Sequence, residues 1–404
     1  MGENIKITFK PSEEKGFTYS KNNGKTTLSC ELSDGKIICY IYYDFRENPL
    51  TLISEADIND NIELKFMPSR IELWVNSRLA DEDWPAGKRL FSETDLLSGS
   101  VKVCVEEFIP EQKTFPSVIG KFENAEGWKP EGNVFVGDCM PYVNDGRYHV
   151  LYLKDRRHHK SKWGFGAHQW EHISTSDFKN WQIHPLAVEI TDPIEGSICT
   201  GSWIKNDCVQ YLFYTVRMAN GAPAPIKRSV SKDGYHFIKD ESFSLVLSDK
   251  YKAPDARDPK VVFGKDGFYH MFLTTSLVEE NKGCLAHLVS KDLSEWTECA
   301  EPIYVHDTSA QPECPDYIEY NGYDYLIYSI GSKAHYLYSK EPFSEWKVPE
   351  NPIIPCSSVP KGAIWEGKIM FTGFTPISGY AGTMTFKEAT NEPNGILTFL
   401  SQDR

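Results

Sequence analysis

Three acidic side chains stand at nearly the same distance ahead of a repeated glycine, and their type and spacing suit acid–base chemistry. They lie eight or nine residues before that glycine: Asp138 before Gly146, Asp258 before Gly267, and Glu313 before Gly322. Like charges held close together raise the pKa of at least one carboxyl, which leaves one proton donor beside one base or nucleophile. Cleavage of a glycosidic bond needs that pair. The alternative, that each acid only caps a turn, explains a single acid better than three in register.

The elements that must position these acids belong to an internal repeat. One unit is a turn followed by an aromatic strand, and it occurs at 144–152, 205–214, 265–273, 320–328 and 365–374. A second unit, with Ser, Asp or Glu and an aromatic residue, follows at 174–181, 229–237, 289–296 and 338–346. Repetition of a four-stranded unit predicts a five-bladed β-propeller over 113–404. A β-sandwich with chance similarity among its hairpins is the weaker alternative.

The propeller would place the three acids together. The segment ahead of each aromatic strand is expected to be the innermost strand of its blade. In the two blades without an acid, the same position falls near Cys199 and Ser358. We therefore expect Asp138, Asp258 and Glu313 to converge at one mouth of the central channel.

The first 112 residues lack the repeat. Short runs rich in Ile, Tyr and Trp alternate with turn residues, as at 36–43, 62–66 and 70–75, which is typical of antiparallel strands. We predict an all-β chain in which a smaller β-sandwich over 1–112, lectin-like or structural, precedes the propeller domain over 113–404. Residues 108–116 are the expected linker.

Charge and composition exclude several other functions. Lys plus Arg total 43 and Asp plus Glu total 57, which gives a net charge of −14 and argues against a general nucleic-acid or anionic-membrane binder. The N-terminus lacks the apolar stretch of a signal peptide, and no run approaches the length of a membrane span, so we expect a cytoplasmic protein. The 10 cysteines are then expected to be reduced. No motif demands a metal or another cofactor, and whether the chain forms a homo-oligomer stays open.

Several ordered motifs resemble glycoside hydrolase family 32, the β-fructosidases, over about 130–375. Residues 257–259 match the Arg-Asp-Pro motif of that family, and Glu313 with Cys314 matches its Glu-Cys motif. The family's Trp-Gly-His…Asp…Trp pattern is matched at its spacing by Trp170, His172, Asp177 and Trp181, and residues 199–202 resemble its Phe-Ser-Gly-Ser.

The resemblance implies a retaining double displacement on a small fructose-containing carbohydrate, without a metal. Asp138 would be the nucleophile and Glu313 the general acid and then base. Asp258 would stabilise the oxocarbenium-like transition state, and Arg257 would hold the carboxylates in position. The sequence departs from the family around Asp138, which lies in Gly-Asp-Cys-Met-Pro, and at Leu153, where the family has Gln.

A basic insertion at 154–163 follows the first aromatic strand. A charge run is usually a solvated loop, but this position favours the pocket rim. Trp163 and Trp170 could stack on a sugar, although Trp in a propeller is more often core. The residues predicted to bind substrate are Arg156, Arg157, His158, Trp163, His168, Trp170, Thr200 and Arg257.

Two alternatives stay open. Family 43 propeller enzymes also carry three acids, but they invert the anomeric centre and act on arabinosides or xylosides. Carboxyl groups about 5 to 5.5 Å apart indicate retention, and a separation of about 6.5 to 9.5 Å indicates inversion. A non-catalytic carbohydrate-binding protein would use the same pocket without an acid pair.

Overall fold

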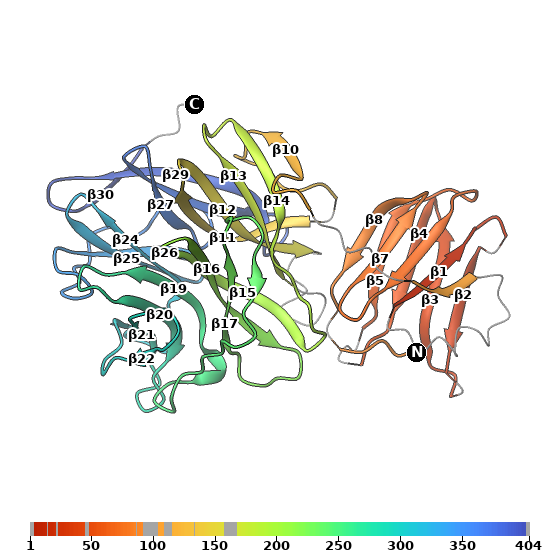
Figure 1. The fold of residues 1–404 in the computed structure, drawn as a ribbon, viewed down its shortest axis with the longest axis horizontal. Coiled ribbons are helices and arrows are strands. Elements are labelled where there is room, and N and C mark those ends of the chain that lie inside the picture. The colour runs from red at the N-terminus through yellow and green to blue at the C-terminus, as the bar shows by residue number, and fades with distance from the viewer. Residues whose placement is uncertain are drawn as a thin grey trace.

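The computed structural model describes residues 4–13, 15–21, 23–44, 48–85, 87–91, 104–108, 115–132, 134–156 and 168–400. These residues are almost entirely strands and turns, with one short 3-10 helix at Ala253–Asp255. Figure 1 shows two bodies, a smaller one formed by the N-terminal strands and a larger one formed by the rest of the chain. The predicted all-β class is confirmed.

Two facing antiparallel sheets form the N-terminal body. One has the order β8-β7-β6-β1-β9 and the other the order β2-β3-β4-β5. Buried and less buried residues alternate along β1, β6 and β7, because one face of each strand packs on the other sheet. The strands are β1 (Ile5–Phe9), β2 (Gly16–Ser20), β3 (Thr26–Ser33), β4 (Lys36–Ile41), β5 (Leu50–Glu55), β6 (Ile62–Phe66), β7 (Ile71–Val75), β8 (Arg78–Asp83) and β9 (Cys104–Glu107).

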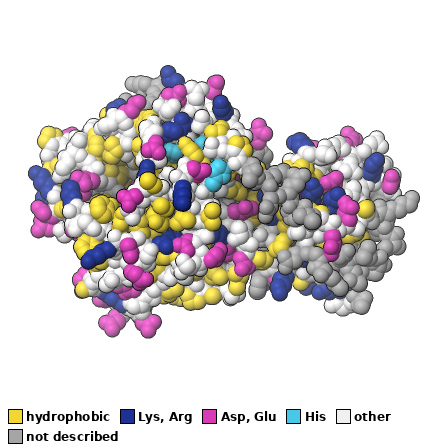
Figure 2. Space-filling model, viewed as in Figure 1, with side chains coloured by type: hydrophobic (Ala, Val, Ile, Leu, Met, Phe, Trp, Pro, Cys, Tyr) yellow, Lys and Arg dark blue, Asp and Glu magenta, His cyan; other side chains and the backbone are white. Residues whose placement is uncertain are grey.

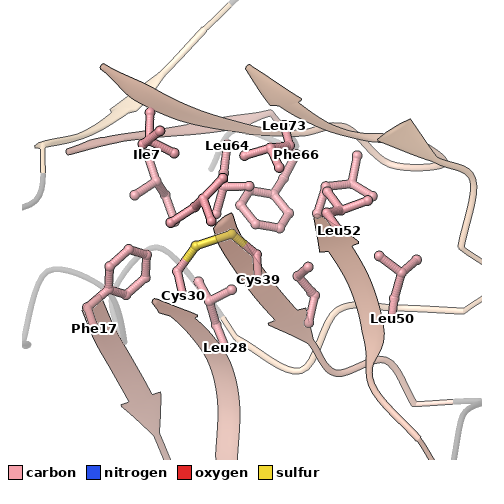
Figure 3. Packing of buried hydrophobic residues seen from close by; sticks show 14 of the residues in the cluster. Ile7, Phe17, Leu28, Cys30, Cys39, Leu50, Leu52, Leu64, Phe66 and Leu73 are labelled. Carbon is pink, nitrogen blue, oxygen red and sulfur yellow. A yellow bond between two sulfur atoms is a disulfide. The ribbon is translucent and has the colours of Figure 1, made fainter. Parts of the chain in front are cut away.

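A disulfide in this core corrects the expectation that all cysteines are reduced. Cys30 on β3 and Cys39 on β4 are direct cross-strand partners with Cα atoms 4.1 Å apart, and their sulfurs are bonded. Both cysteines are buried among the apolar side chains of the two sheets, including Phe17, Leu28 and Leu64 (Figure 3). The register of two strands creates this pair, and the sequence alone did not indicate it. The other eight cysteines carry thiols and form no disulfide.

Five antiparallel blades form the larger body, as the repeat predicts. Blade 1 contains β11 (Val134–Asn144), β12 (Arg147–Arg156), β13 (Gln169–Thr175) and β14 (Asn180–Val188), with β10 (Gly120–Glu123) on its outer edge. Blade 2 contains β15 (Glu195–Asn206), β16 (Val209–Met218), β17 (Ile226–Ser231) and β18 (Ile238–Lys239), and blade 3 contains β19 (Arg257–Phe263), β20 (Tyr269–Ser276), β21 (Gly283–Ser290), β22 (Thr297–Glu298) and β23 (Tyr304–Val305). Blade 4 contains β24 (Glu313–Tyr320), β25 (Tyr323–Ile330) and β26 (Lys333–Ser339), and blade 5 contains β27 (Lys361–Trp365), β28 (Lys368–Pro376), β29 (Gly382–Asn391) and β30 (Leu397–Phe399).

The two repeated sequence units are turns with defined chemistry. In blades 1, 4 and 5 the first is a two-residue hairpin turn in which both residues have positive φ, as at Asp145 and Gly146 (48° and 72°) and at Asn321 and Gly322 (48° and 78°). Such turns match the twist of the flanking strands. The second is a turn closed by an aspartate: the carboxylate of Asp177 accepts the backbone N–H groups two and three residues on, and the same contacts recur at 233 and 292.

The innermost strands close a ring. β11 contacts β15, β15 contacts β19, β19 contacts β24, β24 contacts β27, and β27 contacts β11. One backbone pair, Val136 with Gly382, joins the first blade to the last. The ring confirms that the segment ahead of each aromatic strand lines the central channel.

The N-terminal body packs against blades 1 and 2. The indole of Trp84 is 1% exposed and belongs to the same apolar cluster as Leu151 and Trp170 of the propeller. Lys154 on β12 pairs with Glu82 on β8, with Nζ 3.2 Å from Oε1. The predicted domain boundary at 112 lies outside the described residues. Among the described residues no helix is long and apolar enough to cross a membrane. Acidic and basic side chains are interspersed over the face of the molecule shown in Figure 2.

Candidate active site

A pocket of about 140 Å³ opens at one mouth of the central channel. Asp138 from β11, Asp258 from β19 and Glu313 from β24 all line it, so the structure brings the three predicted acids together. Its wall also contains Arg257, His168 and Thr200 from the predicted set, and Arg217, Cys314 and Tyr380 from outside it. In the described ranges, no group of three or more His, Cys, Asp or Glu side chains is placed to hold a metal ion.

A β-bulge in each of four innermost strands turns these side chains toward the pocket. The strand register shifts between Val136 and Cys139, and again at 198–201, 257–260 and 313–316. A bulge adds an unpaired residue and re-aims its side chain. Asp258 and Cys314 lie in two of these bulges with φ of 58° and 52°, a region that residues with a Cβ rarely adopt. Regular strands would have pointed alternate residues away from the channel.

Three donors surround the carboxylate of Asp138. The hydroxyl of Thr200 donates to Oδ2 over 2.5 Å, the hydroxyl of Tyr380 donates to Oδ1 over 2.8 Å, and the Cys314 thiol lies 3.4 Å from Oδ2. Burial, reinforced by the charge of Asp138, raises the pKa of the Tyr380 phenol and of the Cys314 thiol well above their usual values. Both groups therefore stay protonated at neutral pH and can donate to Asp138.

Arg257 links the other two acids. Its Nη2 donates to Glu313 Oε1 over 2.8 Å, and its Nε lies 3.7 Å from Asp258 Oδ2. Burial acts to lower the pKa of Arg257, but the charges of Asp258 and Glu313 outweigh burial and raise it. The guanidinium is also fixed by Gln311, whose Oε1 accepts from Nη1 over 2.7 Å. The backbone N–H of Cys314 donates to Asp258 Oδ2 over 3.0 Å.

His168 forms part of the wall on the side of blade 1. Its Nε2 lies 2.8 Å from Oδ1 of Asp155, which is fully buried. Its ring centroid is 5.6 Å from that of Tyr380. Asp155 fixes the imidazole orientation, and sequence reasoning missed it because it appeared to be part of a basic loop.

Trp170 corrects one predicted role. Its indole is completely buried, packs in the cluster shared by blades 1 and 2, and does not line the pocket. Nε1 donates to the carbonyl of Cys199 over 2.9 Å. Because Cys199 precedes Thr200, Trp170 supports the bulge that carries Thr200, and it is not placed to stack on a sugar.

The basic insertion begins inside a strand. Lys154 and Asp155 are residues of β12, and both are buried in ion pairs. The expectation of a solvated loop or rim starting at 154 is therefore wrong for these two residues. The side chain of Arg156, together with Arg157, His158 and Trp163, lies outside the described residues.

Several pocket residues were not among the predicted site residues, and three of them are polar groups near the acids. Tyr380 follows the aromatic strand of blade 5, where the repeat offered no guide. Arg217, near the end of β16, is exposed, and in the described part of the chain it has no ion pair. Cys314 was noticed as part of a motif, but its contact with Asp138 depends on the bulge in β24.

Part of the chain is similar to proteins of a known family. Residues 124–352 match the model of the glycosyl hydrolases family 32 N-terminal domain. A probable sucrose-6-phosphate hydrolase from Psychromonas ingrahamii is 29% identical over 194 residues, which cover 46% of this chain and 34% of that protein. The chain thus spans about a third of that relative's length.

Solved structures share the fold. Fructan 1-exohydrolase IIa from Cichorium intybus superposes with a TM-score of 0.58 at 17% identity, covering 69% of this chain and 60% of the other. A family 43 β-xylosidase/α-arabinofuranosidase from a compost microbial metagenome superposes with a TM-score of 0.53 at 16% identity, covering 69% and 98%. Both likenesses concern the fold alone.

Proposed function

The chain belongs to glycosyl hydrolase family 32, and we propose that it hydrolyses β-fructofuranosidic bonds of short fructosides with retention of anomeric configuration. The observation that carries this proposal is the convergence of Asp138, Asp258 and Glu313 from three blades on one small pocket. A nucleophilic carboxylate and a carboxylic acid on opposite sides of a glycosidic bond are the groups that a retaining hydrolase needs.

In the first step Asp138 attacks the anomeric carbon of the fructosyl unit. Among the described residues, Oδ2 of Asp138 accepts from Thr200 and faces the Cys314 thiol, whereas Oδ1 accepts from Tyr380 alone, so Oδ1 retains a lone pair for attack. Glu313 donates its proton to the leaving oxygen, the glycosidic bond breaks, and a fructosyl ester of Asp138 forms. Asp258 accepts hydrogen bonds from sugar hydroxyls and stabilises the positive charge that develops on the ring.

In the second step water hydrolyses the ester. Glu313, now a carboxylate, takes a proton from water while the water oxygen attacks the anomeric carbon and Asp138 leaves. Glu313 is partly exposed, whereas Asp138 is buried. This difference suits an acid that must meet the leaving group and then water, and a nucleophile that must be shielded from water.

The N-terminal body has a structural role in this proposal. It contributes Trp84 to the cluster beneath blades 1 and 2 and Glu82 to the ion pair with Lys154. Lys154 adjoins Asp155, which orients His168. We therefore assign the unit formed by 1–112 to bracing the pocket wall rather than to lectin-like sugar binding.

Product analysis on a substrate panel tests the function. The panel contains sucrose, sucrose 6-phosphate, inulobiose, levanbiose, longer fructans, and aryl arabinosides and xylosides, with the Glu313→Gln variant as the blank. We expect fructose release that disappears in the blank, and NMR of the first product should detect the β-anomer. Release of arabinose or xylose with inversion would replace this proposal with the family 43 alternative. Binding without turnover of any member would leave a carbohydrate-binding protein.

A further inference from the structure

A second layer of charge crosses the channel on the far side of the three acids. It contains Lys260 on β19, Asp316 on β24 and Lys361 on β27, and these residues line a cavity of about 270 Å³ at the opposite mouth. Lys260 Nζ lies 2.5 Å from Asp316 Oδ1, and the other oxygen, Oδ2, accepts the backbone N–H of Gly362 over 2.7 Å. Both carboxylate oxygens of Asp316 therefore have partners other than Lys361. Lys361 is the second cation of this layer, and Asp316 does not pair with it.

Lys361 is buried without a matching carboxylate. It is 2% exposed, and in the described part of the chain no acidic oxygen lies within 4.0 Å of its Nζ. Its one hydrogen bond runs from Nζ to the carbonyl oxygen of Gly201 over 3.0 Å. Taking an ammonium ion out of water costs several kcal/mol, so such a residue needs compensation from its surroundings.

The compensation comes from the side of the acids. Burial lowers the pKa of Lys361, while the negative charges of Asp316 and, more weakly, Asp258 act to raise it. The charged and titratable groups around it are Asp258 and Lys260 from β19 and Cys314 and Asp316 from β24. The acid layer itself has three carboxylates and two guanidinium groups, those of Arg257 and of the exposed Arg217, so it has a shortage of positive charge that Lys361 reduces.

The hydrogen bond from Lys361 to Gly201 also affects the position of Asp138, through Thr200. Gly201 ends the bulge in β15 that carries Thr200, and a Cβ at 201 would lie 1.8 Å from the carbonyl oxygen of Phe213. The backbone at Gly201 is therefore tightly packed, and Lys361 holds its carbonyl on the channel side. Thr200, one residue earlier, donates to Asp138 over 2.5 Å.

We infer that Lys361 is a positioning residue for the hydrolysis, one that supplies positive charge beneath the acids and fixes the Gly201 carbonyl so that Thr200 faces Asp138. The inference rests on the proposed function. A purely structural lysine at this site would contribute packing alone. The two roles differ in their effect on the pH dependence of catalysis, because loss of a nearby positive charge makes carboxylates harder to ionise.

The test compares pH profiles of kcat/KM for the wild type, Lys361→Met and Lys361→Gln on the best substrate of the panel. Loss of a buried positive charge close to the acids is expected to move the acid limb upward by about one pH unit. Lys361→Gln keeps a donor for Gly201, so we expect it to show the same shift of the limb with a smaller loss of kcat than Lys361→Met. Lys368→Met is the matched control, because Lys368 lies on the same blade in an exposed ion pair with Glu388.

An acid limb that stays in place in folded Lys361→Met and Lys361→Gln would overturn the inference. Failure of both variants to fold would also overturn it, since exchanging a buried charge for a side chain of similar volume is often neutral or stabilising, and Lys361 would then be structural. A wild type that is inactive on the whole panel would reject the proposed function, and this inference with it. An active wild type with unshifted variants would reject the inference alone.

Discussion

Acid should destabilise this protein well above the range in which its carboxylates titrate, because several histidines are buried in neutral form. His149, His172 and His184 cluster in blade 1, where His149 Nδ1 lies 3.0 Å from His172 Nε2 and the rings of His172 and His184 are 4.5 Å apart. In blade 3, His287 lies 2.8 Å from His270. Burial, with help from neighbouring positive charge, lowers the pKa of His149 to about 3 and those of His184 and His287 to about 4.

These pKa shifts determine the direction and the size of the change in stability with pH. A histidine whose folded pKa lies below its unfolded value of about 6.5 binds its proton mainly in the unfolded state, so stability is full above that pH and falls as pH drops toward the folded pKa. At pH 5 each of the three histidines costs about 2 kcal/mol relative to pH 7.5. Together they cost about 6 kcal/mol, a large part of the 5–15 kcal/mol typical of a domain.

Other titrating groups do not cancel this effect. Hydrogen bonds from the backbone and side chain of Asn180 hold the pKa of Asp177 far below its usual range, so its contribution stays constant above about pH 4. His236 is exposed, and its hydrogen bond to Asp233 raises its pKa, which gives a small effect of opposite sign.

Urea unfolding at pH 7.5, 6 and 5 measures the prediction, with His149→Phe and His306→Asn as the compared variants. His149 is stacked on Tyr142, with ring centroids 4.6 Å apart, so Phe should preserve the packing while removing one proton site. We expect the wild type and His306→Asn to lose several kcal/mol between pH 7.5 and 5, and His149→Phe to lose about 2 kcal/mol less. A wild-type free energy of unfolding that is unchanged over this range would refute the reasoning.

Three further predictions concern the pocket and its supports. Tyr380→Phe removes a charge-assisted hydrogen bond to Asp138 worth about 1.5–3 kcal/mol, so kcat/KM should fall by about tenfold or more, and an unchanged value would argue against attack by Oδ1. Trp170→Phe should lower the melting temperature with little change in KM, because the indole supports Cys199 from the core; a large rise in KM with unchanged stability would restore a sugar contact. Trp84→Ala should lower the free energy of unfolding by about 3–5 kcal/mol and reduce activity, because the pocket wall near Asp155 loses support. Denaturant unfolding and kcat/KM measure the two effects, and wild-type values of both would argue against the bracing role.

The sequence predicted the blades because their signals are local. Turn residues such as Asp145 and Gly146 tolerate positive φ better than other residues do, and an aspartate at 177 caps its own turn. Such chemistry repeats wherever the blade repeats, so the period was readable from the sequence. The approximate position of the three acids within their blades could be predicted from the same repeat.

The contacts inside the pocket depend on features that repeats do not encode. Whether Asp138 faces the channel depends on the bulge between Val136 and Cys139, and a shift of one residue would turn it away. Tyr380 reaches Asp138 from the connection between β28 and β29, which lies outside the two repeated sequence units. The pairing of Cys30 with Cys39 depends on the register of β3 and β4.

A residue type that suggests a functional role does not show whether the side chain is buried. Trp170 lies on a strand that starts beside the pocket. Burial of its large apolar surface between two blades is more favourable than exposure at the pocket rim. Lys361 was not predicted to be functional. Its position at the start of a blade did not indicate that it is buried next to the acid layer.

The most direct test of the central claim is mass spectrometry of Glu313→Gln after incubation with an activated aryl β-fructofuranoside. A good leaving group allows the first step without the acid, and loss of the base slows the second step. We expect a protein heavier by one fructosyl unit, with the added mass on the peptide that contains Asp138 and absent from the matched Asp138→Asn, Glu313→Gln double variant. Turnover by the wild type with no adduct in Glu313→Gln and an inverted first product would contradict it.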